Sequence, residues 1–387
     1  MRNVIIQSIR VYVLLGLFLF VCCKEEKRDL SLNFISDYKI PLRSGGLSMI
    51  PDWKIVNYNN ESYFAYHHVY DHHIEVYDLY KKEFSYKIPY ETEGPDKIRL
   101  LDFDLFEDKV ILVGRNNIML VNKEGQVLRK YSNYPNKENS LRGIEYDEYS
   151  IRIGNNLRGD VDYIDAENQF VYTPIFREDI SALEEAFFQT QVLAYQLDMN
   201  EGNTRPLNIS YPDDSEQYGV LSTSHFFSSY LLPYLCLAEN RYIFYNFPFS
   251  SFVGKYDIEA GRVERSAAIN SKFTSNAISP FSEDLSKREG IRRMLNKEVS
   301  FGPVVHDPYQ SLCYRKHLGT KEEDKEDIPQ YFTVFDERLN KKGEVKLPEH
   351  LSRFNYAPTK EGIYFSLAAG YNPSEDTIYL KLYELKQ

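Results

Sequence analysis

Short extended segments recur along the chain with a regular polar–apolar pattern. A polar turn followed by three strand-forming residues occurs six times, and the residue two places before each run is Glu, Asp, Asn or Gln, which favours a turn. The runs begin at Tyr63, Val110, Phe170, Tyr242, Leu312 and Ile363. A second strand signal follows each start, at residues 75–78, 119–122, 193–196, 254–257, 333–336 and 381–384. Self-similarity of this kind predicts a repeat fold in which each unit is one small sheet.

Glycine-containing turns follow the second strand in three of the copies. They contain Gly125, Gly261 and Gly343, and another extended segment comes after each. A tight hairpin needs a residue with positive φ, which glycine adopts without steric cost. The pattern therefore predicts a hairpin with a positive-φ glycine at all three positions.

The last copy is too short to complete its sheet, because only residues 384–387 follow Tyr383. An unassigned strand signal lies at the other end of the chain, at residues 32–42. We predict that this segment supplies the outer strand of the last sheet, which would close a ring and remove an open sheet edge. The predicted fold class is all-β: a six-bladed β-propeller closed by an N-terminal strand, with short helical insertions. Apolar side chains at helical spacing place these helices at residues 177–190 and 282–298.

The N-terminus has the pattern of an export signal. The apolar run at residues 11–21 is shorter than the about 20 residues that a membrane-spanning helix needs, and it suits a secretory signal. Cys22 and Cys23 follow, which resembles a bacterial lipoprotein signal, where a cysteine after the apolar run receives a diacylglycerol. Cys23 is the predicted lipidation site, because the branched Val21 would be a poor residue before Cys22. An uncleaved anchor helix is the alternative.

These features divide the chain into three parts. We expect residues 1–22 to be a signal peptide, residues 23–30 a tether and residues 31–387 a single propeller domain. Residues 24–26, Lys-Glu-Glu, resemble the export tag of Bacteroidetes surface lipoproteins. The expected location is the bacterial outer membrane, through the lipid at Cys23, with surface exposure as the first expectation and a periplasm-facing position as the alternative.

Composition and charge narrow the choice of partners. Tyr and Phe number 32 and 24, and both favour half-buried strands. The formal charge of −11 disfavours nucleic acid as the partner. Cys236 and Cys313 both lie in apolar runs, so buried free thiols are expected, and one disulfide in an oxidising compartment is the alternative.

A set of short motifs resembles a known family. Glu93-Gly94-Pro95-Asp96 is followed by strand-like segments at residues 101–105, 108–113 and 120–125. Together with the layout from the acylated cysteine to the C-terminal strand, these motifs resemble the Bacteroidetes lipoproteins of domain of unknown function 4221, which are related to six-bladed β-propeller lipoproteins. Asp96 stands where that family typically has Asn. The resemblance implies a propeller and no particular activity.

Half of the eight histidines are clustered, at His67, His68, His72 and His73. Neutral imidazole is a ready ligand for zinc or copper. Neighbours in a strand point to opposite faces, so His67 and His68 cannot both reach one ion, although one of them could pair with a histidine across the turn. A polar hairpin tip is the simpler interpretation. We therefore predict no metal or other cofactor and keep a metal at these four histidines as the weaker alternative.

Catalytic signatures are missing from the sequence. There is no Gly-x-Ser-x-Gly elbow, His-Glu-x-x-His pair or phosphate-binding glycine loop, and Asp102 and Asp104 lack the glycine and distal glutamate of a calcium loop. No catalytic residue is predicted. We expect an envelope or surface lipoprotein with a non-catalytic binding or scaffold role, whose ligand is a glycan, a peptide or an envelope protein. The alternative is an extracellular propeller hydrolase or lyase acting on glycan, with or without a metal.

Overall fold

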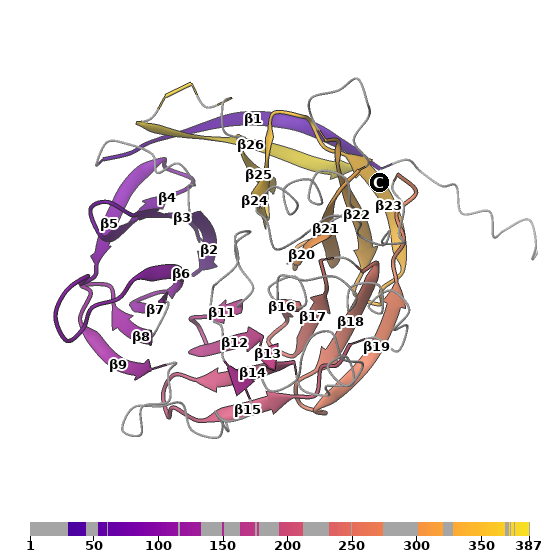
Figure 1. The fold of residues 1–387 in the computed structure, drawn as a ribbon. Coiled ribbons are helices and arrows are strands. Elements are labelled where there is room, and N and C mark those ends of the chain that lie inside the picture. Colours follow the sequence, from indigo (N-terminus) through magenta and orange to yellow (C-terminus); the bar gives the residue numbers. More distant parts are fainter. Residues whose placement is uncertain are drawn as a thin grey trace, which may run out of the picture.

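The structure is a computed structural model, and its described residues form a ring of sheets. They are residues 30–43, 53–59, 61–114, 117–132, 149–150, 163–174, 176–177, 193–211, 232–248, 250–273, 301–319, 328–367, 371, 373–374 and 376–386. Over these residues every regular element is a strand and none is a helix. Six four-stranded antiparallel sheets surround a common centre (Figure 1). The all-β, six-bladed propeller is therefore confirmed.

Each blade has its first strand nearest the centre and its fourth strand at the outer edge (Figure 1). Blades 1 to 3 consist of β2 (Trp53–Tyr58), β3 (Glu61–His68), β4 (His73–Asp78) and β5 (Glu83–Pro89); β6 (Leu100–Phe106), β7 (Lys109–Gly114), β8 (Asn117–Asn122) and β9 (Val127–Ser132); and β11 (Tyr163–Asp165), β12 (Phe170–Pro174), β14 (Ala194–Asp198) and β15 (Thr204–Leu207). Blades 4 and 5 consist of β16 (Tyr234–Ala238), β17 (Tyr242–Asn246), β18 (Phe252–Asp257) and β19 (Arg262–Ala268); and β20 (Phe301–Asp307), β21 (Leu312–Leu318), β22 (Gln330–Asp336) and β23 (Lys341–Lys346). Two further short strands, β10 (Tyr149–Ser150) and β13 (Phe176–Arg177), pair with each other.

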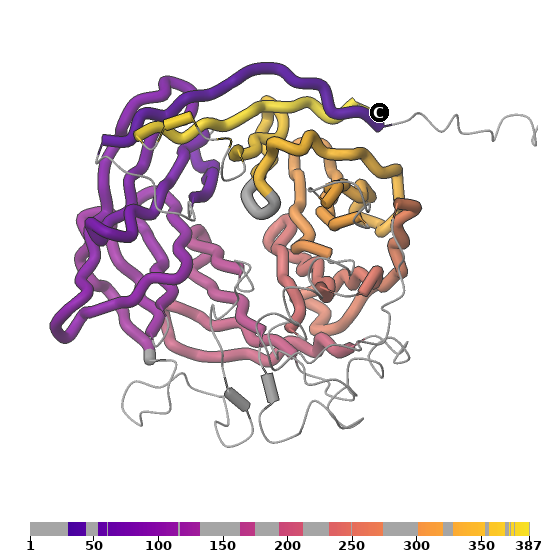
Figure 2. Tube along the Cα trace, turned by 45° about the horizontal axis from the view of Figure 1, so that its top comes forward, coloured from indigo at the N-terminus to yellow at the C-terminus, as the bar shows by residue number. Residues whose placement is uncertain are grey.

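Blade 6 joins the two ends of the chain. Its inner three strands are β24 (Leu351–Thr359), β25 (Gly362–Leu367) and β26 (Thr377–Lys386), and its outer strand is the N-terminal β1 (Ser31–Pro41). β1 runs antiparallel to β26, from Ser31 opposite Lys386 to Pro41 opposite Thr377. Figure 2 shows the two strands side by side along the edge of the ring. The predicted closure by an N-terminal strand is confirmed.

The sequence repeat corresponds to the second and third strands of each blade. The six predicted starts all fall within the first three residues of β3, β7, β12, β17, β21 and β25. The polar residue at the end of the third strand closes the following turn, because its side chain accepts backbone N–H groups there. Asp78 Oδ1 accepts from the Lys81 N–H at 2.8 Å, and Asp257 Oδ1 accepts from the Ala260 N–H at 2.9 Å.

Two of the three glycine predictions are confirmed. Gly125 and Gly261 have φ values of +81° and +64°. The prediction for Gly343 is wrong, because this residue lies inside β23 and the positive φ of its turn, +61°, belongs to Leu339. Gly343 meets a different requirement: a Cβ there would lie 2.8 Å from Leu30 Cδ1, so its small size lets the N-terminal segment approach blade 5.

The buried apolar residues that the structure describes form six clusters, and each lies between two adjacent blades. β7 illustrates the pattern, since successive side chains of a strand point to opposite faces. Val110 and Leu112 pack towards blade 1, whereas Ile111 and Val113 pack towards blade 3. Six blades with six apolar interfaces form a closed ring, and the interface between blades 6 and 1 includes Ile40 of β1.

The strand connections differ strongly between the two sides of the ring. One side, which we call the turn face, carries the turns within hairpins at residues 59–60, 79–82, 107–108, 123–126, 166–169, 199–203, 239–241, 258–261, 308–311, 337–340 and 360–361. On the other side, which we call the loop face, lie the strand ends that are joined through residues 42–52, 69–72, 90–99, 115–116, 133–162, 175–193, 208–233, 247–251, 269–300, 319–329, 347–350 and 368–376. All the long connections therefore leave the ring on one face.

Two sequence predictions lie largely outside the part of the chain that the structure describes. The helical insertions expected at residues 177–190 and 282–298 fall there, apart from Arg177, which belongs to β13. The signal peptide and lipidation site fall there as well. Among the described residues, no helix is long and apolar enough to span a membrane.

Candidate functional site

The histidine cluster lies on the β3–β4 hairpin, which turns at the loop face. His67 and His68 point to opposite faces of blade 1, as predicted. His67 Nε2 lies 2.6 Å from the Tyr90 hydroxyl and packs on the blade 2 side. His68 lies opposite His73 across the hairpin, and their rings stack with centroids 5.1 Å apart.

The structure does not gather the four histidines around one point. His73 Nε2 faces Glu75 Oε1 at 3.4 Å, and His72 occupies the turn with φ +55° and its ring near Tyr90. Within the described ranges, no group of three or more His, Cys, Asp or Glu side chains is arranged to hold a metal ion. His67, His68 and His73 are instead buried in the hairpin, whereas His72 is exposed at its turn.

A charged cluster joins the inner strands of blades 1, 2 and 3. Lys54 Nζ of β2 lies 2.8 Å from Asp102 Oδ1 of β6, and Asp102 is only 4% exposed. Two residues further along β6, Asp104 Oδ2 accepts the Ala166 N–H of blade 3 at 3.2 Å. Asp102 and Asp104 therefore bind neighbouring blades. The sequence singled out both aspartates but gave no signal for Lys54, because the contact is between blades.

Asp104 is the residue of this cluster whose pKa is shifted towards neutrality. Burial raises the pKa of Asp104 to about 6, against the opposing effect of the Lys54 charge. A carboxyl group with a pKa near neutrality can exchange a proton with a bound ligand. A second carboxylate, Asp165, is committed to its own turn, since its two oxygens accept the backbone and side-chain N–H groups of Asn168 at 3.0 Å each. The cluster thus offers one carboxyl group, Asp104, whose raised pKa suits proton exchange.

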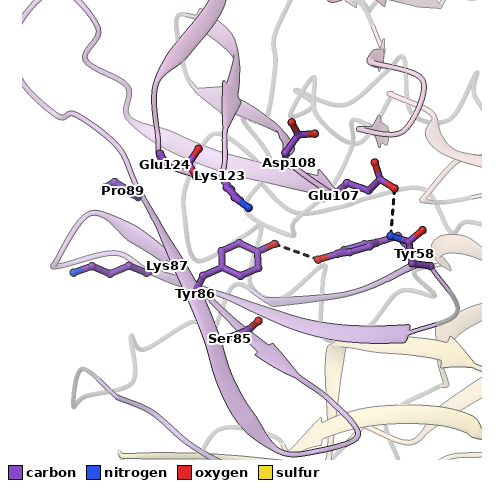
Figure 3. A pocket seen from close by; sticks show the side chains of 10 residues that line it. Tyr58, Ser85, Tyr86, Lys87, Pro89, Glu107, Asp108, Lys123 and Glu124 are labelled. Atoms are coloured by element: carbon purple, nitrogen blue, oxygen red, sulfur yellow. Dashed lines mark hydrogen bonds between the residues drawn. The ribbon is translucent and has the colours of Figure 1, made fainter.

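A hollow of about 970 Å³ opens on the turn face between blades 1 and 2 (Figure 3). One wall is β5, and the other is formed by the turns of blade 2. The lining residues are Tyr58, Asn59, Ser85, Tyr86, Lys87, Pro89, Glu107, Asp108, Lys123 and Glu124. Two lysines, three carboxylates and two tyrosines are among these residues, so the lining is strongly polar.

The tyrosines of this hollow are held in place by one another. The Tyr58 and Tyr86 hydroxyls lie 3.2 Å apart, as the dashed line in Figure 3 marks. Tyr58 also stacks on Tyr63 with ring centroids 4.4 Å apart. Burial raises the pKa of Tyr58 to about 12, and the hydrogen bond to Glu61 raises the pKa of Tyr63 to about 12. Both phenols stay protonated at neutral pH and serve as hydrogen-bonding groups, not as bases.

Blade 5 contains a fully buried guanidinium group. Arg315 Nη1 donates to the Ser251 carbonyl at 2.9 Å, and Nη2 donates to the Ile269 carbonyl at 2.5 Å. The guanidinium carbon lies 4.1 Å from the centre of the Phe301 ring. Burial lowers the pKa of Arg315 to about 9, which still leaves it charged at neutral pH. Arg315 therefore fixes two loop-face connections of blade 4, and the sequence alone gave no indication of this role.

Beside Arg315 lies a group that has the composition of a catalytic triad but not its geometry. His317 Nε2 lies 2.9 Å from Ser271 Oγ and 3.6 Å from Glu344 Oε1, whereas Nδ1 faces Thr333 Oγ1 at 3.3 Å. A triad needs the serine and the carboxylate on different ring nitrogens. Burial lowers the pKa of His317 to about 4, and its side chain is inaccessible. This buried network is structural, because it links three strands of blade 5 to Ser271.

Cys236 and Cys313 are buried free thiols in the cluster between blades 4 and 5. Burial raises the pKa of Cys236 to about 12, so its thiol is not a nucleophile at neutral pH. The predicted free thiols are confirmed, and the alternative disulfide is not formed.

Comparison with known proteins supports the fold. The sequence profile of the family described as "Domain of unknown function (DUF4221)" matches residues 31–346. The crystal structure of a DUF4221 member from Bacteroides vulgatus is similar, with a TM-score of 0.71 at 14% identity, and the match covers 94% of this chain and 100% of that one. A crystal structure from Bacteroides fragilis, described as a "Putative exported protein", has a TM-score of 0.52 at 10% identity, over 92% and 96% of the two chains. No curated protein matches.

Proposed function

Because this chain belongs to the DUF4221 family, a family of unknown function, we propose a role from its geometry: a lipid-anchored protein of the bacterial outer membrane that binds a ligand through its loop face and catalyses no reaction. The contrast between the two faces carries this proposal. On the turn face no connection is longer than five residues, whereas the loop face carries connections as long as residues 133–162 and 269–300. Binding residues concentrate in connections that a rigid scaffold holds.

The bases of these connections are firmly held. Arg315 binds the carbonyls of Ser251 and Ile269, where two connections of blade 4 leave their strands. β10 and β13 pair a segment of the connection after blade 2 with a segment of the connection inside blade 3. A rigid base lowers the entropy that a loop loses when it binds. The ligand class we propose is a glycan, a peptide or another envelope protein.

The proposed anchor rests on the sequence. Cys23 follows a short apolar run, and the whole chain has a formal charge of −11, so anionic headgroups would not hold it without a lipid. The matched family member of known structure comes from Bacteroides, which agrees with the export tag at residues 24–26. We propose surface exposure, and digestion of intact cells with an external protease would separate it from a periplasm-facing position.

A pull-down with matched variants tests the binding role. The full-length protein is isolated from its own envelope beside two variants: one with residues 276–298 replaced by a Gly/Ser linker, and one with Glu124→Lys in the turn-face hollow. We expect the partner to be lost from the first variant and kept by the second. A partner lost only from Glu124→Lys would place binding in the hollow and contradict the proposal.

A second candidate function, hydrolysis or elimination on a glycan, is favoured by one observation, the pKa of about 6 at Asp104. The test is a screen of the parent protein against a panel of glycans beside Asp104→Asn. Turnover by the parent that the variant loses, with the thermal transition of the fold retained, would favour the enzyme. Ligand binding without turnover in either protein would favour the binding role.

A further inference from the structure

We propose that the outer edge of blade 6, at the start of β1, rests on the membrane, with Phe34 and Ile35 in the lipid interface. We call residues 31–36 the β1 edge. This inference rests on the proposed lipid at Cys23 and adds a lipid surface as the partner of one defined part of the propeller. It leaves the loop face free for the ligand.

The register of β1 places its start at a defined position. Ser31 lies opposite Lys386, at the end of β26. In the other five blades the end of the third strand leads through a tight turn of the turn face into the fourth strand, so the β1 edge lies at the turn-face end of blade 6. Pro41, at the other end of β1, leads to the connection at residues 42–52 on the loop face. The chain therefore enters the propeller on the side away from the long connections.

The distance from the anchor is short. Seven residue steps separate Cys23 from Leu30, and even fully extended they span no more than about 25 Å. Leu30 is fixed to the propeller by its contact with Gly343 of blade 5. β1 itself covers about 36 Å along its eleven residues at about 3.3 Å each. The start of β1 is thus held nearer to the lipid headgroups than its end.

The β1 edge presents two adjacent apolar side chains to solvent. Phe34 is 51% exposed and Ile35 is 47% exposed. The pairing register shifts between Phe34 and Ser36, so Ile35 is the extra residue of a β-bulge and has no opposite partner on β26. A bulge disturbs the usual alternation, which is how two successive apolar residues of one strand both remain uncovered.

The surroundings of these side chains have the chemistry of a membrane interface. Lys381 Nζ lies 5.1 Å from the centre of the Phe34 ring and also pairs with Asp37 Oδ1 at 2.7 Å, and Phe34 packs edge-on against Tyr383. Aromatic rings beside lysines are typical of the headgroup region, where the rings enter the interface and the ammonium groups remain with phosphate and water. Exposed aromatic residues also occur on the loop face, for example Tyr70 at 71%, so exposure alone does not identify the surface that meets the membrane. The short distance to the proposed anchor at Cys23 favours the β1 edge.

Fluorescence quenching by brominated lipids tests the placement. The protein has one tryptophan, Trp53, which is 6% exposed and gives a constant background. The lipidated full-length protein is reconstituted in vesicles as the parent, as Ile35→Trp and as Tyr70→Trp, the matched control on the loop face. We expect lipids brominated near the headgroup to remove most of the added emission of Ile35→Trp and none of that of Tyr70→Trp.

Other results would overturn the inference. Stronger quenching of Tyr70→Trp would mean that the loop face meets the membrane, and added emission unquenched in both variants would mean that the tether holds the propeller away from it. Mass spectrometry of the mature N-terminus, with Cys23→Ala as the unlipidated control, is carried out first. Absence of the lipid refutes the proposed anchor together with this placement, whereas a lipidated protein without quenching refutes the placement alone. Circular dichroism confirms that each variant retains its sheets.

Discussion

Closure of the ring by β1 can be tested with one buried side chain. Ile40 is fully buried, lies opposite Ile378 of β26, and belongs to the cluster between blades 6 and 1. Truncation of such a residue to alanine removes apolar contacts and leaves a cavity, at a cost of about 2–5 kcal/mol. We expect Ile40→Ala to reduce the free energy of unfolding by about 3 kcal/mol, which for a protein of this length lowers Tm by about 4 °C.

The control lies on the same strand. Ile35 is 47% exposed, so Ile35→Ala in the unlipidated protein should change stability by no more than about 0.5 kcal/mol. Both variants are compared with the parent by urea denaturation and by thermal scans, with circular dichroism as the signal. Equal, small effects of the two substitutions would refute the conclusion that β1 completes blade 6, because a strand that is not docked gives no penalty at either position.

Four further substitutions test a packed glycine, a turn glycine, a buried carboxyl group and the buried arginine. Gly254→Ala should reduce the free energy of unfolding by about 1–3 kcal/mol, because the new Cβ would collide with the buried Tyr245 ring. Gly261→Ala should reduce it by about 1 kcal/mol through its positive φ alone. Thermal denaturation measures both. Asp104 has a raised pKa in the folded protein, so the free energy of unfolding of the parent should fall by up to about 3 kcal/mol as pH rises from about 4 through 6. Urea unfolding of the parent and of Asp104→Asn at pH 4.5 and 7.5 checks this, and the loss should be smaller for the variant. Arg315→Met should destabilise the protein by about 3 kcal/mol in the same assay, because it removes the charged donor from the Ile269 carbonyl and one of the two donors of the Ser251 carbonyl. An unchanged midpoint would contradict the bracing role.

The parts of the fold that were predictable depend on local patterns. Polar residues such as Asp78 and Asp257 end the third strands and close the turns that follow, so the repeat is readable within a few residues of chain. The opposite directions of His67 and His68 follow from the two-residue period of a strand. The N-terminal strand was predictable because the last blade lacked one strand and an unassigned strand signal lay at the other end of the chain.

The parts that could not be predicted depend on contacts between blades. The ion pair of Lys54 with Asp102 and the contacts of Arg315 with Ser251 join residues of different sheets, and nothing in the local sequence encodes such pairs. The same limit explains the error at Gly343, where a glycine that resembles a turn residue serves instead to admit Leu30. The turn-face hollow likewise exists only because two blades meet.

If the lipid is at Cys23, β1 both closes the ring and is the strand to which the tether is attached. It is an eleven-residue strand and pairs with β26 along nearly its whole length. A pull along β1 loads these hydrogen bonds together in shear, whereas a pull across it would open them one pair at a time from Ser31. Docking of Phe34 and Ile35 on the membrane would hold the first pairs in place and oppose that opening. The long pairing of β1 with β26 and the membrane contact of the β1 edge would therefore both prevent a force on the anchor from opening the ring.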